Sequence, residues 1–194
     1  MGYRRMDTFT AIFDACVFYP APLRDILLEF SGEGIFRARW TDQIHDEWIR
    51  NVLDNNSHIK PGHLARTRQL MDQAVPDFLV LGYEHLIKSL NLPDKNHRHL
   101  LAAAIVARAA VIVTFNTKDF PEHALKPYGL KAQHPDDFLI SQFDRAQEPV
   151  CAAIKRLRSR LKNPPMNVAA YLANLRQQQL LQFEQRLQLF KDVI

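Results

Sequence analysis

The stretch AAAIVARAAVIVTFNTKDFP (Ala102–Pro121) constrains the fold more than any other part of the sequence. An alanine-rich helical pattern passes directly into the apolar, β-branched run Val111–Val113, so a helix is followed at once by a buried strand. Strands that are apolar on both faces are typical of parallel sheets covered by helices. The chain turns polar at Asn116 and Asp119, beyond the carboxyl end of the strand, which is where α/β proteins bind their ligands.

The same alternation of strands and helices recurs along the chain. TAIFDACVFY (Thr10–Tyr19) is a second apolar, β-rich run, and we expect FLVLGYEHLIKSL (78–90) to be a strand that passes into a turn and a short helix. Between them, residues 38–56 have apolar positions at helical spacing, with Thr41 or Asp42 as the N-cap. We therefore predict an α/β fold with a parallel sheet flanked by helices.

Composition excludes several classes of protein. The 194 residues are 47% hydrophobic, enough for one substantial core plus an extension. The formal net charge is +4, a mild bias that fits a polyanionic partner without demanding one. No apolar run reaches ~18 residues, so we expect no membrane-spanning segment. Cys16 and Cys151 form no CxxC pattern, which argues against a disulfide framework or zinc site and favours a reduced, cytoplasmic protein.

The last part of the chain differs from the rest. Residues 151–194 contain eight Lys or Arg and two acids, a net +6, so the first 150 residues carry −2. We divide the chain into residues 1–145, the sheet domain, and 146–194, a helical C-terminal extension. NPPMN (163–167) splits the extension, and 168–190 is expected to form one long helix with a single apolar face. Its charges either contact a polyanion or face water.

Four carboxylates stand at the ends of predicted elements. Asp14 interrupts an apolar strand, where a buried carboxylate is costly unless it is paired or caps a turn. Glu47 lies on a helix, where the simpler interpretation is a solvated face. Asp94 precedes a helix and Asp119 begins the capping-box pattern Asp-Phe-Pro-Glu122, so both have a structural explanation as caps. Taken together, they can converge at one sheet edge, and carboxylates that converge there suit Mg²⁺ or Mn²⁺.

Other catalytic patterns are missing from the sequence. There is no GxGxxG and no GxxxxGK[ST], which removes dinucleotide-binding and P-loop folds. A phosphatase of the DxD type needs an aspartate where Cys16 stands, and there is no GxSxG. The eight histidines include the run His97–His99 but no HExxH, so zinc is disfavoured.

With these carboxylates in this order, the sequence resembles the PIN-domain ribonucleases, and among them the VapC-type toxins of bacterial toxin–antitoxin pairs. The resemblance covers about residues 10–140, and the tail resembles the helical C-terminal extension of one branch. It lies in FDACVFYP around Asp14, HDEWIRNV around Glu47, LPDKNHRHLLAAAIVARA from Leu92 and VIVTFNTKDFP from Val111.

The resemblance implies a PIN-like parallel sheet with an acidic Mg²⁺ or Mn²⁺ pocket at one edge. It assigns metal ligation to Asp14, Glu47, Asp94 and Asp119, closure of the site to Asn116, and contact with a ligand or the scissile phosphate to Thr114. It implies an endoribonuclease that acts on RNA such as tRNA or rRNA, is neutralised by a cognate antitoxin and often dimerises.

One position departs from the family pattern Pro-Asp-x-[Asn/Asp]-Asp-Arg-His. Here the sequence is PDKNHRH, so His97 stands where a second acid is expected. Imidazole is a poor ligand for Mg²⁺ but a reasonable one for Mn²⁺, so metal affinity falls, the preferred metal changes, or activity is lost. Alternatively His97 donates a proton to the leaving oxygen. A second hypothesis is therefore a catalytically weakened PIN domain that binds RNA or protein, and the apolar face of the last helix is a candidate for dimerisation or antitoxin docking.

Overall fold

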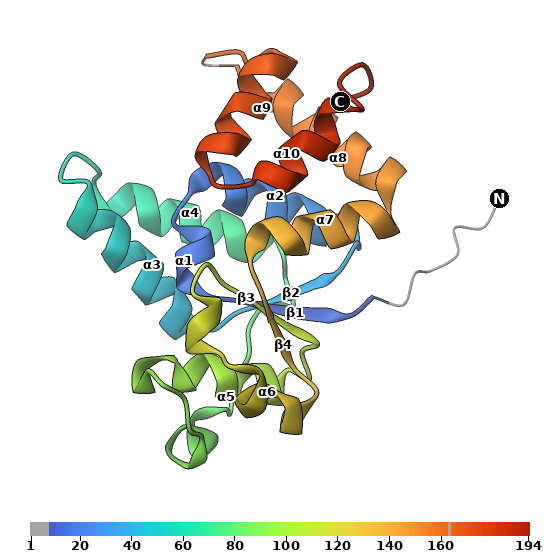
Figure 1. The fold of residues 1–194 in the computed structure, drawn as a ribbon. Helices are drawn as coiled ribbons and strands as arrows, with labels where there is room; N and C mark the ends of the chain where they lie inside the picture. The colour runs from blue at the N-terminus through green and yellow to red at the C-terminus, as the bar shows by residue number, and fades with distance from the viewer. Residues whose placement is uncertain (1–7, 163) are drawn as a thin grey trace.

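A four-stranded parallel sheet forms the centre of the computed structural model, which describes residues 8–162 and 164–194 (Figure 1). The strands lie in the order β2-β1-β3-β4. Ile12 on β1 aligns with Arg39 on β2 and with Ile112 on β3. Their bounds are β1 (Thr10–Phe13), β2 (Arg37–Arg39), β3 (Val111–Val113) and β4 (Lys131–Gln133). The predicted α/β class with a parallel sheet is confirmed.

Helices cover the sheet on both sides. Figure 1 shows α5 and α6 on one side, and α2 and α7 on the other with α8, α9 and α10 beyond them. The α-helices are α1 (Ala15–Phe18), α2 (Ala21–Gly32), α3 (Asp42–Asn55), α4 (Pro61–Ala74), α5 (Arg98–Val106), α6 (Glu122–Leu125), α7 (Pro135–Arg145), α8 (Gln147–Arg160), α9 (Val168–Gln177) and α10 (Leu181–Gln188). Short 3-10 helices are η1 (Glu84–Ser89), η2 (Lys95–His97), η3 (Thr117–Asp119) and η4 (Lys126–Tyr128). Within the described residues, no helix is long and apolar enough to cross a membrane.

Aromatic side chains fill the core between the sheet and α7. Phe138 of α7 meets Phe36 edge to face with ring centroids 5.0 Å apart, and it meets Phe13 of β1 at 5.8 Å. All three are fully buried. Burying each phenyl ring stabilises the fold by about 1.5–3 kcal/mol, so α7 is held firmly against the strand that leads to Asp14.

The strand expected at residues 78–90 is reduced to a single bridge. Trp40 N donates to Phe78 O, and Val80 N donates to Trp40 O, both at 3.0 Å. The chain then turns at Gly82, whose φ of +76° is a conformation that glycine adopts without strain, and continues as η1. The short helix was predicted correctly, but the strand was too long.

The prediction of a single long helix at residues 168–190 is wrong, because the segment forms two helices, α9 and α10, with a turn between them. Gln179 has a φ of +62°, which no α-helix accommodates, and Leu180 beside it is fully buried. The predicted apolar positions are packed inside the chain, with Phe183 against Phe30 and Phe190 against Phe143. That face is therefore not open to a partner. The break expected at NPPMN does separate α8 from α9, although Asn163 lies outside the described residues.

Half of the eight basic residues of the extension form ion pairs within the chain. Arg156 and Arg160 both bind Glu29 of α2, at 2.9 and 2.7 Å. Further pairs join Arg176 to Glu184 and Arg186 to Asp144. The sequence suggested that these charges either contact a polyanion or face water. Four of the arginines instead pair with carboxylates of the same chain. The boundary at residues 145/146 falls between α7 and α8 and stays a prediction.

Candidate functional site

Asp14 lies directly after β1, at the carboxyl end of the sheet. Its backbone N donates to Val113 O of the neighbouring strand at 3.1 Å, and its side chain is buried. The Oδ2 atom accepts hydrogen bonds from Thr114 Oγ1 at 2.6 Å and from Cys16 Sγ at 3.2 Å. Asp14 precedes α1, but its side chain makes no capping hydrogen bond to that helix. The strand-end cap considered from the sequence is therefore not what holds this carboxylate.

Cys16 is a member of this cluster that the sequence motifs did not single out. Its Sγ also lies 3.5 Å from Thr114 Oγ1 and accepts from Phe115 N at 3.4 Å. Burial and the charge of Asp14 raise the pKa of the thiol to about 12. The thiol is therefore protonated at neutral pH and able to donate to Asp14. Its position two residues after Asp14, in the first turn of α1, is the signal that could have identified it.

The segment after β3 closes this cluster through its backbone. Asn116 N donates to Thr114 Oγ1 at 3.0 Å, so the threonine hydroxyl accepts from one group and donates to Asp14. Thr114 itself is fully buried. The Asn116 side chain is part of an exposed residue at the start of η3. Thr114 thus contacts the predicted carboxylate, and Asn116 reaches the cluster only through its main chain.

His97 links two further predicted acids. Its Nδ1 lies 3.6 Å from Asp94 Oδ2 and 3.6 Å from Asp119 Oδ2, and its ring packs on Phe120 with centroids 5.3 Å apart. Both polar distances exceed hydrogen-bond length, and Nδ1 has no hydrogen-bond partner. The residue that replaces the expected acid therefore sits between two carboxylates, where a positive charge is favourable.

The capping explanations hold for one of these acids and not for the other. Asp94 Oδ1 accepts from Asn96 N at 2.8 Å, so Asp94 caps η2 as its sequence position suggested. Asp119 ends η3, and the residue that precedes α6 is Pro121, with no side-chain cap. The capping box considered for Asp119 and Glu122 is wrong, because Asp119 belongs to η3 and α6 begins only at Glu122, with Pro121 as its N-cap. Asp119 has no capping role that would account for its carboxylate.

Glu47 does not occupy the solvated helix face considered for it. Its Oε1 lies 3.1 Å from Nε2 of the buried His99 and accepts from Gln43 Nε2 at 3.0 Å. Burial alone raises the pKa of Glu47, but the hydrogen bond and charge of His99, with smaller effects of Gln43 and Arg50, bring it below its ordinary value. The ring Nδ1 of His99 has no hydrogen-bond partner. Motif reasoning missed His99, although it follows His97 by two residues on α5.

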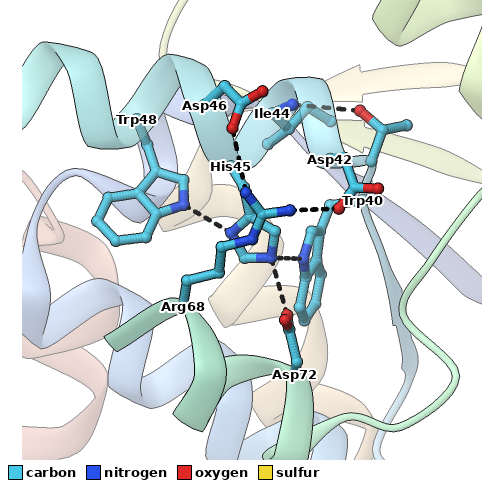
Figure 2. Close-up of polar contacts among 9 residues, drawn as sticks. Trp40, Asp42, Ile44, His45, Asp46, Trp48, Arg68 and Asp72 are labelled. Carbon is cyan, nitrogen blue, oxygen red and sulfur yellow. Dashed lines mark hydrogen bonds and ion pairs between the residues drawn. The ribbon is translucent and has the colours of Figure 1, made fainter. Parts of the chain in front are cut away.

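The helix that carries Glu47 is anchored by a buried histidine. Figure 2 shows the indoles of Trp40 and Trp48 directed at the ring of His45. Trp48 Nε1 donates to Nδ1 at 2.9 Å, Trp40 Nε1 donates to Nε2 at 2.7 Å, and Nε2 lies 2.9 Å from Asp72 Oδ1 of α4. Burial lowers the pKa of His45, and Asp72 opposes this only in part. If both ring nitrogens carried protons, each N–H would face an indole N–H, which is also a donor. The neutral ring is therefore favoured.

A second contact fixes α4 against α3. Arg68 of α4 binds Asp42 and Asp46 near the start of α3 (Figure 2). Asp42 and Asp46 are exposed, so each pair contributes only about 0–1 kcal/mol. The buried node at His45 is therefore the main restraint on the position of α3, and through α3 on Glu47.

The predicted acids thus form pairs rather than one cluster. Among residues 8–162 and 164–194, no group of three or more His, Cys, Asp or Glu side chains is placed to hold a metal ion. Carboxylate oxygens are the donors that Mg²⁺ and Mn²⁺ prefer, but no three of these side chains meet at one point. The side-chain arrangement is therefore not a formed metal site, although its chemistry is compatible with one.

Comparisons with known proteins agree with the motifs. Residues 135–189 match the model of the VapC50 C-terminal domain, which begins at the first residue of α7. Over 97 residues, half of this chain, the sequence is 46% identical to the protein named "Putative ribonuclease VapC50" of Mycobacterium tuberculosis (strain ATCC 25618 / H37Rv), of which the match covers 57%. No solved structure matches the chain with statistical significance. The chain is therefore similar to a VapC-type protein over about half of its length, in agreement with its motifs.

Proposed function

We propose that this protein is an endoribonuclease that hydrolyses RNA phosphodiester bonds at the carboxyl edge of its sheet. The observation that carries the proposal is the Asp14–Thr114 pair at the ends of β1 and β3, on the edge to which Asp119 also belongs. The sequence identity to a protein named as a ribonuclease supports the same activity. The helices of the extension act as scaffold in this proposal, since most of their arginines are paired.

Within this site, Thr114 and Cys16 orient the first carboxylate. They occupy Oδ2 of Asp14, while Oδ1 receives no hydrogen bond from the described residues. Oδ1 is thus left for water or a cation. Hydrolysis forms a bond from water oxygen to phosphorus and breaks the bond to the 3′ oxygen, leaving a 5′-phosphate and a 3′-hydroxyl. We propose His97 as the proton donor to that leaving oxygen.

We further propose that the reaction needs Mg²⁺ or Mn²⁺. A bound divalent ion neutralises charge on the phosphate and on neighbouring carboxylates. The residues proposed to hold it are Asp14, Glu47, Asp94 and Asp119. If His97, which lies between Asp94 and Asp119, contacted the ion instead of donating a proton, Mn²⁺ would be preferred over Mg²⁺, because imidazole is a better ligand for Mn²⁺.

The VapC name of the relative supports a cognate antitoxin as partner. We propose that the antitoxin inhibits the nuclease at its acidic edge, where a basic side chain can replace the charge of the metal. Structured RNA such as tRNA or rRNA is the proposed substrate. A homodimer and a cytoplasmic location stay predictions.

A second candidate is a module that binds RNA or protein without cleaving it. The observation that favours it is the lack of any three metal-ligating side chains in one place within the described parts of the chain. The two candidates differ in one experiment, in which purified protein is incubated with mixed RNA in EDTA, Mg²⁺ or Mn²⁺ beside the Asp14→Asn variant. Metal-dependent cleavage that the variant lacks supports the nuclease. Absence of cleavage by folded protein free of antitoxin supports the binding module.

A further inference from the structure

Two exposed lysines stand beside two of the site's acids. Lys95 follows Asp94 at the start of η2, and Lys118 precedes Asp119 in η3. We propose that these two residues, the lysine rim, bind the phosphate backbone of the RNA next to the site of cleavage. This inference rests on the proposed function and assigns its substrate-binding residues.

The fold brings the two lysine-bearing turns together. His97, the last residue of η2, lies 3.6 Å from Asp119 Oδ2 and packs on Phe120, which directly follows η3. Lys95 and Lys118 therefore belong to adjacent three-residue turns, although they stand 23 positions apart in the sequence. A phosphate chain that passes the acids at this edge also passes both turns.

The acids beside the lysines are engaged elsewhere. Asp94 accepts from Asn96 N through Oδ1, and its Oδ2 faces His97. Asp119 Oδ2 also faces His97. Among the residues that the structure describes, neither Lys95 nor Lys118 makes an ion pair or a side-chain hydrogen bond. The two ammonium groups are therefore not held by the acids next to them in sequence and can contact a ligand.

The extension does not offer a comparable surface through its arginines. Arg156, Arg160 and Arg176 form ion pairs with carboxylates of the chain. The helices of the extension lie on the other side of the sheet from α5, into which η2 leads (Figure 1). Phosphate contacts from Lys and Arg dominate the affinity for nucleic acid, so the unpaired cations nearest the acids matter most. Arg50 also lies near an acid, but it lowers the pKa of Glu47 and is unsuitable for a clean test.

The test compares two double variants that remove the same charge from different places. Lys95→Gln/Lys118→Gln alters the rim, and Lys155→Gln/Lys191→Gln removes two exposed lysines of the extension. Both carry Asp14→Asn, and binding of a short fluorescein-labelled RNA of mixed sequence is measured by anisotropy in EDTA at several salt concentrations. Exposed substitutions of this kind change stability by about 0.5 kcal/mol or less, which thermal melts verify.

We expect the rim variant to bind RNA roughly tenfold more weakly, with a salt dependence reduced by about 0.7 per lysine, as for phosphate contacts to single strands. The extension variant should bind within about twofold of its parent. In cleavage assays without Asp14→Asn, the rim variant should raise KM with little change in kcat.

Equal losses in the two double variants would overturn the rim, because net charge alone would explain them. Unchanged RNA binding by the rim variant would also overturn the proposal. This holds even if the variant binds an antitoxin more weakly. Cleavage by the parent protein is recorded separately. If the parent does not cleave RNA but the rim variant still binds it more weakly, the proposed nuclease fails and the RNA-binding rim stands.

Discussion

The carboxyl edge of the sheet and the C-terminal extension both contain acidic side chains with partners in the same chain, but the distances to those partners differ. In the extension's contact with α7, Asp136 accepts from Gln182 N and Phe183 N at 2.9 Å, and Glu184 accepts from Arg176 at 2.8 Å. At the edge, His97 stays 3.6 Å from each of its two carboxylates. Short, complete contacts stabilise the fold, whereas incompletely neutralised acids are available to a ligand.

The comparison has a thermodynamic consequence. Asp94 and Asp119 flank His97 without a short contact to it, so neutralising one of these two acids should cost little stability. Removing Asp136 at the contact between α7 and the extension leaves buried donors unsatisfied and costs stability directly. Substitutions at the edge should therefore change mainly activity, and substitutions at the contact between α7 and the extension should change mainly stability.

The largest effect is expected for Asp14→Asn. The amide keeps the shape of the side chain and one acceptor for Thr114, but it removes the charge proposed to act on the reaction. Cleavage of RNA should fall by at least about a hundredfold. The free energy of unfolding, from urea denaturation, should change by less than about 1 kcal/mol. A variant that cleaves normally would remove Asp14 from the site, and one that unfolds would make it a structural residue.

Asp136→Ala should do the reverse. The substitution leaves two backbone N–H groups at the start of α10 without an acceptor, and caps of this kind contribute about 1–2 kcal/mol. Urea denaturation should show a loss of about 2 kcal/mol, while cleavage per folded molecule stays unchanged. The control is Asp137→Ala, since Asp137 is exposed and binds only the Gln182 side chain. Equal destabilisation by both variants would contradict the capping role of Asp136.

The fold could be predicted wherever local sequence and tertiary contacts agree. The β-branched run at Val111–Val113 and the Thr41 cap of α3 carry their structure in neighbouring residues, and both are observed. The break at Gln179 could not be foreseen, because the glutamines around it are good helix formers. It depends on Asp136, more than forty residues earlier, which caps the new helix.

For the site, the motifs named candidate acids but not the side chains that contact them. Asp14 and Thr114 stand one hundred positions apart, and only the sheet register makes them hydrogen-bonded neighbours. Cys16 and His99 became recognisable as partners only through contacts with Asp14 and Glu47. The two Trp donors to His45 also left no local pattern, because the node forms from three elements.

Acid should destabilise the sheet domain through His45, and the extension has no comparable group. All eight histidines precede α7 in the sequence. Burial lowers the pKa of His45 in the folded protein. As the pH falls through about 6.5, the unfolded chain therefore binds a proton at His45 that the folded protein does not bind. Stability present above about pH 6.5 is therefore lost as the pH falls, with a slope of at most about 1.4 kcal/mol per pH unit from this group.

Urea denaturation of wild type and His45→Gln at several values between about pH 5 and pH 8 measures this slope. The variant should be less stable at high pH but flatter below about pH 6.5. Exposed His58 supplies the control, since His58→Gln should keep the wild-type slope. An undiminished slope in His45→Gln would assign the acid sensitivity to other groups, among them Asp72 and Asp42 that face the ring.

The two cysteines allow the smallest and most local comparison of the two regions. Burial raises the pKa of both thiols, but the charge of Asp14 adds to the effect only at Cys16. Asp14→Asn removes that charge, so Cys16 should become more reactive while Cys151 does not change. Native alkylation by iodoacetamide in EDTA, followed peptide by peptide with mass spectrometry, should show Cys16 reacting roughly threefold faster for a pKa lower by one. Cys151 in the same sample controls for any loosening of the fold. If both cysteines accelerate together, the substitution has opened the structure, and if neither does, the charge of Asp14 does not act on the thiol that donates to it.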